Sequence, residues 1–141
     1  MRARDIMTSE VKSLNPNSTV RDAAQIMKEL NVGSVPVLEG NKPVGMITDR
    51  DIAIRNVANA GDVNTPVSQV MTGDVVFATP EMAEHEVARL MAENQIRRLP
   101  VVDNGSMVGI IALGDLAVNS RSDLEAGKAL STISVPSEPK R

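Results

Sequence analysis

The polar side chains best suited to hold a ligand lie in one short segment, where an expected strand runs into an expected helix. It reads Gly45-Met46-Ile47-Thr48-Asp49-Arg50-Asp51. Thr48 stands at the helix entrance, where free N–H groups and the helix dipole favour a phosphate. Asp51 follows one turn later, and its carboxylate can accept two hydrogen bonds from a vicinal diol such as that of a ribose. Gly45 would let another group approach the backbone closely.

The same spacing has a purely structural interpretation. Thr48-x-x-Asp51 is also a capping box, in which both residues serve only to start the helix. A second copy of the pattern bears on the choice, because Ala112 stands in place of Thr48 while Asp115 is retained. An acid without its hydroxyl partner points to another role, although Asp115 could itself cap the helix. Both interpretations stay open.

Two adjacent cations are further candidates for a ligand phosphate. Arg97 and Arg98 directly precede an expected core strand, where a guanidinium can bind a phosphate through two hydrogen bonds. The alternative is a pair of solvated arginines, or an ion pair with nearby Glu93. Arg50 is interpreted as a surface residue of its helix, with a phosphate contact as the alternative.

Metal binding and catalysis have few candidates. His85 is the only histidine, and Glu81 four residues earlier could share a helix face with it, but no third ligand is evident. A solvated acidic helix face is therefore favoured. The chain has no cysteine, and Met27 and Met91 fit helix stripes that face the core. We therefore predict no metal site, no resident cofactor and no enzymatic activity.

Composition excludes several other classes. The 141 residues are 42% hydrophobic and 23% charged, as in an ordinary soluble globular protein. A net charge of −3 argues against nucleic acid, and Phe77, the only aromatic residue, cannot stack a series of bases. No apolar run is long enough to cross a membrane, and the start of the chain lacks a signal-peptide core. The expected location is the cytoplasm.

The elements that must position these residues occur twice. At a fixed shift of 64 residues, 14 of 47 aligned positions are identical, where chance would give about three. The fold expected is therefore α+β, with two β-α-β-β-α repeats packed about a pseudo-twofold axis. The identical residues of the first copy are Met7, Thr8, Val11, Pro16, Ala24, Met27, Glu29, Pro36, Val37, Val44, Gly45, Ile47, Asp51 and Ala53.

Local patterns set the elements of the first repeat. After a short extended stretch (11–14) and a turn at Pro16, Thr19 and Asp22 have capping-box spacing and start a helix. Its buried stripe and the elements that follow are then read from spacing and turn signals. The stripe is Val20, Ala23, Ala24, Met27 and Leu30, with Gly33 as the left-handed residue at the helix end, a strand at 34–38, a turn at 39–42, a strand at 44–48 and a helix at 49–56.

The second repeat follows the same order. A helix is expected at 84–91, strands at 99–102 and 108–112 around a turn at 103–106, and a short helix at 114–119. The predicted domains are repeat 1 at 4–57, a linker at 58–66, repeat 2 at 67–120, a C-terminal helix at 121–134 and a tail at 135–141. Thr65-Pro66 is expected to start a one-turn helix.

The order of these motifs resembles a pair of CBS domains, named after cystathionine β-synthase, of the small stand-alone bacterial type. The resemblance covers about residues 4–119. The motifs that carry it are Met7-Thr8, the Pro16 turn, the helix with Ala24 and Met27, Val35-Pro36-Val37, Gly45-x-x-Thr48-x-x-Asp51, Arg97-Arg98-Leu99-Pro100-Val101-Val102-Asp103 and Gly109-x-x-Ala112-x-x-Asp115.

The resemblance implies a regulatory module with two clefts between its lobes, which binds AMP, ADP, ATP or S-adenosylmethionine and associates into a homodimer. The family's ribose-binding acid corresponds to Asp51 and Asp115, and its phosphate-side hydroxyl to Thr48 alone. We therefore expect one competent site and one weak or empty one, with a regulated protein as a further partner. The adenine-facing strand and the entry residue correspond to Ser34, Val35, Pro36 and Val37, and to Thr8 or Thr72.

A second hypothesis keeps the fold and drops the ligand. The pair would then be a structural module for dimerisation or partner binding, with clefts that no longer function. Gly45, Thr48 and Asp51 favour the sensing module, whereas Ala112 and the capping-box interpretation favour the structural one.

Overall fold

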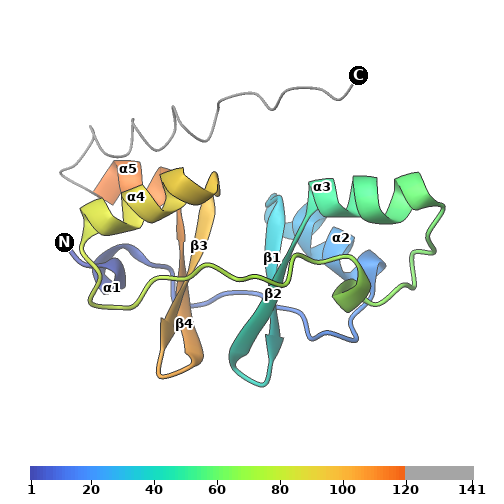
Figure 1. The fold of residues 1–141 in the computed structure, drawn as a ribbon, viewed down its shortest axis with the longest axis horizontal. Coiled ribbons are helices and arrows are strands. Elements are labelled where there is room, and N and C mark those ends of the chain that lie inside the picture. The colour runs from blue at the N-terminus through green and yellow to red at the C-terminus, as the bar shows by residue number, and fades with distance from the viewer. Residues whose placement is uncertain (120–141) are drawn as a thin grey trace. The chain divides into compact units, whose positions relative to one another are not determined.

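The computed structural model describes residues 1–119, and Figure 1 shows their elements. Helices and strands are mixed, and the strands form two separate two-stranded antiparallel sheets. The predicted α+β class with a duplicated unit is confirmed. The C-terminal helix and tail predicted at 121–141 lie outside the described residues. No helix in the part of the chain that the structure describes is long and apolar enough to cross a membrane.

The chain divides into two compact units, and each unit takes in a segment that lies far from its sheet along the chain. The first-sheet unit consists of Glu10–Val75 with Asn104–Met107. The second-sheet unit consists of Met1–Ser9, Val76–Asp103 and residues 108–119. The first nine residues thus pack with the second sheet, and the residues just after the linker pack with the first sheet.

In the first-sheet unit, helix α2 (Val20–Leu30) begins as its sequence predicts. The Thr19 N–H donates to the Asp22 carboxylate at 2.9 Å, and the Asp22 N–H donates to the Thr19 hydroxyl at 3.1 Å. The prediction for the other end was wrong, because Asn31 and not Gly33 is the left-handed residue, with φ of 54°. Asparagine tolerates this conformation because its short polar side chain can bond locally.

The core-facing stripe of α2 is narrower than predicted. Val20, Ala23 and Met27 are buried, whereas Ala24 is exposed and Leu30 keeps 48% of its surface. Two of the five predicted stripe residues therefore lie off the core of the described chain. The buried cluster of this unit consists of Leu14, Val20, Ala23, Met27, Val35, Val37, Ile47, Val67 and Val70.

The first sheet pairs β1 (Ser34–Glu39) with β2 (Lys42–Thr48) through a tight turn that uses Gly40 at φ of 64°. The register shifts between Val37 and Leu38, one residue after Pro36, which has no N–H to give to the ladder. On its other side β1 bonds to Leu14, whose N–H donates to the Pro36 carbonyl at 3.0 Å. A one-turn helix, η3 (Val67–Gln69), follows Pro66 and belongs to the same unit.

The second-sheet unit repeats the plan with small differences. It contains α1 (Ala3–Ile6), α4 (Glu84–Asn94), β3 (Arg98–Asp103), β4 (Ser106–Ala112) and α5 (Leu113–Asn119). Helix α4 extends three residues past its predicted end and stops at Gln95, which has φ of 51°. Its core consists of Ala3, Ile6, Ala78, Val87, Ala88, Met91, Leu99, Val101, Ile111 and Leu116.

Candidate functional site

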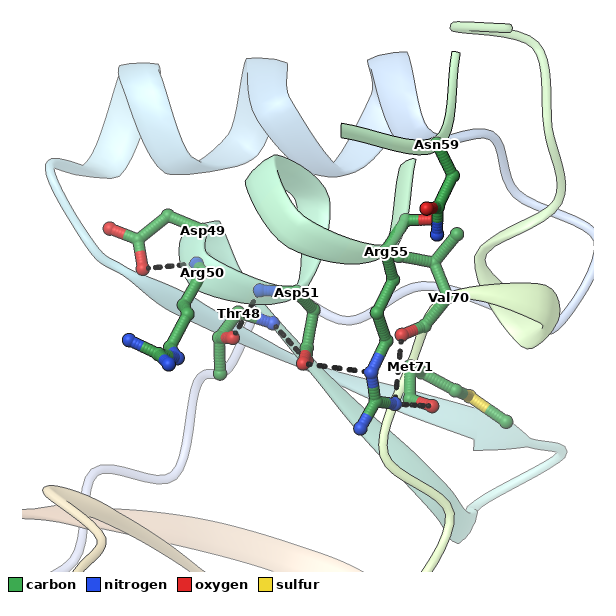
Figure 2. Close-up of polar contacts among 8 residues, drawn as sticks. All are labelled: Thr48, Asp49, Arg50, Asp51, Arg55, Asn59, Val70 and Met71. Carbon is green, nitrogen blue, oxygen red and sulfur yellow. Dashed lines mark hydrogen bonds and ion pairs between the residues drawn. The ribbon is translucent and has the colours of Figure 1, made fainter. Parts of the chain in front are cut away.

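Thr48 and Asp51 form a reciprocal capping box at the end of β2 (Figure 2). The Thr48 N–H donates to Oδ2 of Asp51 at 3.0 Å, and the Asp51 N–H donates to Oγ1 of Thr48 at 3.0 Å. The predicted capping box is therefore present in the structure. The box leaves Oδ1 of Asp51 outside these two bonds and leaves the Thr48 hydroxyl proton able to donate.

Asp51 has a cationic neighbour that the sequence analysis missed. Nε of Arg55 lies 3.9 Å from Oδ1 of Asp51, an ion-pair distance but too long for a hydrogen bond (Figure 2). The Asp51 side chain is only 12% exposed, whereas that of Arg55 is 51% exposed. The spacing of four residues between an acid and a base on a helix is a signal that could have identified this pair.

The helix that carries these residues is irregular and longer than predicted. It begins as α3 (Asp49–Asp51), continues as a π-helix, η1 (Ile52–Asn56), and ends as a 3₁₀ turn, η2 (Val57–Asn59). Asn56 is buried, and its amide donates to the Asp62 carbonyl at 3.1 Å. Short π-helical turns are rare and occur often at functional sites, so this one marks the segment for attention.

The close neighbour of Gly45 is a protein side chain. A Cβ atom at Gly45 would overlap the side chain of Met71, and one at Gly109 would overlap Met7. In each unit a methionine lies against the glycine of the second strand of the sheet. Each methionine comes from the segment that packs with the sheet of the other repeat, Met7 from the first nine residues and Met71 from the residues after the linker. The expected need for close approach is real, but Met71 accounts for it at Gly45.

The two candidate entry threonines lie in different units. Thr72 exchanges two backbone hydrogen bonds with Met46 of β2, at 2.9 and 3.0 Å, and so belongs to the unit of Thr48 and Asp51. Thr8 makes the equivalent bonds with Ile110 of β4, at 2.8 and 3.0 Å. Both side chains are exposed. Within the first-sheet unit, Thr72 and not Thr8 is therefore the threonine that accompanies Asp51.

The strand expected to face an adenine is mostly closed to solvent in this structure. Val35 and Val37 belong to the buried cluster of the first-sheet unit, and Pro36 between them is also buried. Ser34 is half-buried, at the beginning of β1 and opposite Thr48 in the register. Of the four predicted residues, Ser34 is thus the one with an accessible side chain.

The remaining candidates lie in the second-sheet unit. Arg97 is exposed and Arg98 is half-buried at the beginning of β3, and neither forms an ion pair with Glu93 or any other described residue. Asp115 is half-buried in the first turn of α5. The structure does not bring these three residues together with Thr48 and Asp51 in one unit.

Glu81 and His85, the two candidate metal ligands, do not lie on one helix. Glu81 lies in a turn before α4, and its carboxylate forms ion pairs with Arg2 and Arg4, whereas His85 lies on the helix itself. No group of three His, Asp or Glu residues that could hold a metal ion occurs among residues 1–119.

The duplicated order of elements and the two small sheets define a protein built from tandem α+β modules. The CBS domain model matches residues 3–55 and 67–121. Because these two ranges cover most of the 141 residues, the chain belongs to the CBS domain family and is a CBS pair.

Several proteins are similar to this chain over most of its length. The CBS domain-containing protein YhcV of Bacillus subtilis is 50% identical over 131 residues, which is 93% of this chain and 94% of YhcV. The crystal structure of Hypoxic Response Protein I with two coordinated zinc ions has a TM-score of 0.80, at 32% identity and covering 85% of this chain and 99% of that one. CBSX2 in complex with AMP has a TM-score of 0.74, at 26% identity and covering 84% and 94%.

Proposed function

We propose that this CBS pair is a regulatory module that binds an adenosine nucleotide, with Asp51 as the acid that accepts the ribose hydroxyls. The observation that carries the proposal is that the two oxygens of the Asp51 carboxylate have different partners. Oδ2 accepts the capping bond from Thr48, while Oδ1 faces Arg55 at 3.9 Å and keeps lone pairs for a ligand. The similarity to CBSX2, which was solved with AMP, supports the choice of ligand class.

Thr48 and hydroxyls of the same unit complete the proposed site. The Thr48 hydroxyl accepts from the Asp51 N–H, so that its own proton can be donated to a phosphate oxygen. Ser34 and Thr72 are further accessible hydroxyls of the same unit. In the second-sheet unit, Arg97 and Arg98 are separately proposed as phosphate-binding cations, because no ion pair with another described residue neutralises them.

The proposed module acts by binding, without catalysis or a resident cofactor, as a cytoplasmic homodimer. Regulation follows if the nucleotide binds one arrangement of the chain better than another. Asp115 belongs to a second site that is weak or empty, because Ala112 provides no hydroxyl beside it.

The capping box itself favours a second candidate function. Since Thr48 and Asp51 satisfy each other's backbone N–H groups, helix initiation alone can explain both residues. The chain would then be a structural module for dimerisation or partner binding. Ile54 and Val57, both exposed apolar residues of the helical segment after Asp51, are compatible with such a role.

The two functions are separated by a control that the chain itself offers. Asp22 has the same capping bonds as Asp51, to Thr19, but on another helix. Asp51→Ala and Asp22→Ala therefore remove the same kind of helix cap. Calorimetric titration with AMP, ADP, ATP, NADH and S-adenosylmethionine is carried out on the wild-type chain, on these two variants and on Asp115→Ala.

The sensing module predicts binding that is lost in Asp51→Ala and retained in both other variants. The structural module predicts no heat of binding with any of the five ligands. Binding that Asp51→Ala and Asp115→Ala weaken equally would contradict the assignment of one competent site.

A further inference from the structure

Arg55 connects the Asp51 carboxylate to backbone that lies 15 residues or more further along the chain. One side of its guanidinium faces Oδ1 of Asp51, at 3.9 Å from Nε. On the other side, Nη1 donates to the carbonyl oxygens of Met71 at 3.1 Å and Val70 at 3.3 Å (Figure 2). Guanidinium suits this bridge because its five N–H donors lie in one rigid plane.

The segment that Arg55 reaches is in turn fixed to the strand that precedes Asp51. Met71 lies against Gly45, and Thr72 exchanges two backbone hydrogen bonds with Met46. Strand β2 then ends at Thr48, which caps Asp51. These contacts form a closed loop from Asp51 through Arg55 and the 70–72 segment to β2 and back. A change at the carboxylate can therefore reach the 70–72 segment through one side chain.

The arginine of this bridge is not repeated at the equivalent position of the second repeat. The residue 64 positions after Arg55 is Asn119, which carries no charge. Helix α5, which holds Asp115, is α-helical over its described length, whereas Arg55 lies in the π-helical turn η1. The repeat that retains the Thr48 hydroxyl is thus the repeat that has the cation.

We propose that Arg55 is a positioning residue, which orients the Asp51 carboxylate for the ligand and couples its occupancy to the 70–72 segment. The ligand half of this inference rests on the proposed function. Ribose hydroxyls bound to Oδ1 share the negative charge that attracts the Arg55 guanidinium. The strength of the hydrogen bonds from Arg55 to the Val70 and Met71 carbonyls changes as a result. The 70–72 segment, which belongs to the second repeat along the chain but packs in the first-sheet unit, is the part that responds.

The test combines AMP titration with amide hydrogen exchange measured by NMR. Arg55→Gln removes the charge, Arg55→Lys keeps the charge without the planar fork, and Arg21→Gln on α2 removes a charge elsewhere in the same unit. The reporting amides are those of Met71 and Thr72, which donate to the carbonyls of Val67 at 2.8 Å and Met46 at 2.9 Å. Thermal unfolding confirms that each variant is folded.

We expect Arg55→Gln to weaken AMP binding by about two- to fivefold, the range of a half-exposed ion pair. Exchange at Met71 and Thr72 rises in the same variant, Arg55→Lys lies between it and the wild type, and Arg21→Gln matches the wild type. Arg55→Gln and Arg21→Gln with equal affinity and equal exchange would overturn the inference.

Asp51→Asn separates a failure of this inference from a failure of the proposed function. Introduced alone, it is expected to raise exchange at Met71 and Thr72, and introduced into Arg55→Gln it is expected to add nothing. An equal increase in both backgrounds shows that Arg55 does not transmit the change. A wild-type chain that binds no nucleotide overturns the proposed function and the ligand half of this inference, and the exchange data then decide the bridge alone.

Discussion

The side chain of Met71 occupies the space in front of Gly45 on β2, where any Cβ atom would overlap it. Met7 stands in the same relation to Gly109 in the other unit, with its Sδ 2.6 Å from the position of such a Cβ atom. The two glycines differ in one respect. Beside Gly109 the Thr8 carbonyl oxygen, a backbone atom, would also lie only 2.9 Å away. A methionine side chain can move aside, but this carbonyl is held by its hydrogen bond to Ile110.

Gly109→Ala is therefore expected to destabilise the chain more than Gly45→Ala, within the range of about 1–3 kcal/mol for an overpacked site. Urea denaturation measures both. Adding Met71→Ala should recover a large part of the loss in Gly45→Ala, whereas adding Met7→Ala should recover less in Gly109→Ala. Equal recovery would show that the Thr8 backbone yields as easily as a side chain.

Thr48→Ala is expected to lower the free energy of unfolding by about 1 kcal/mol, because it removes the acceptor for the Asp51 N–H. Thr19→Ala should cost a similar amount, since the Thr19 hydroxyl caps Asp22 in the same way. Thr48→Ser keeps the hydroxyl and should stay close to the wild type in a denaturant titration.

Ligand affinity distinguishes the two threonines. Thr48→Ala should also weaken nucleotide binding, because its hydroxyl donates to a phosphate in the proposed site, and Thr19→Ala should not. Two alanine variants with the same affinity would indicate that Thr48 acts only as a cap.

Local chemistry explains why the starts of the helices and the hairpins could be predicted. A cap such as Thr19 with Asp22 is decided by residues three apart, so the sequence contains all the relevant information. Helix ends were less accessible. The left-handed residues at the ends of α2 and α4 are Asn31 and Gln95. Glutamine, unlike glycine or asparagine, is not a residue type that predicts this conformation.

Tertiary contacts explain the rest of the differences. Ala24 and Ala88 are identical in the repeat, yet the first is exposed and the second buried, because the neighbours of each helix differ. The exchange of the Met7 and Met71 segments between the units is likewise invisible to periodicity. In the candidate site, Asp51 and Thr48 were readable from spacing, and Arg55 would have been had acid-base pairs four apart been considered.

Ala60→Gly is expected to stabilise the chain, against the usual direction of such a change. Ala60 has φ of 58° at the end of η2, a conformation that costs a residue with a Cβ atom about 1 kcal/mol or more. Glycine removes that cost, but it also gives the unfolded chain more conformational entropy, which offsets part of the gain. The free energy of unfolding should therefore rise by about 0.5 kcal/mol. Thermal unfolding measures the gain.

Ala53→Gly is the control for this prediction. Ala53 lies in η1 with an exposed side chain, and glycine there should cost about 1 kcal/mol. A loss of stability in Ala60→Gly as well would show that the linker does not hold its left-handed turn in solution.

Ala112→Thr tests the difference between the two repeats by restoring the missing hydroxyl. Ala112 ends β4 and precedes α5, as Thr48 ends β2 and precedes α3, and Asp115 lies three residues further on. A threonine here can form a capping box with Asp115, which should raise the free energy of unfolding by about 0.5–1 kcal/mol.

If the hydroxyl is also what the second site lacks, the calorimetric stoichiometry for AMP should rise from one toward two per chain. Asp115→Ala in the same background should return the stoichiometry to its original value. Higher stability at unchanged stoichiometry would show that a Thr-Asp pair is sufficient for a cap and insufficient for a nucleotide, and would direct attention to Arg55, which the second repeat does not have.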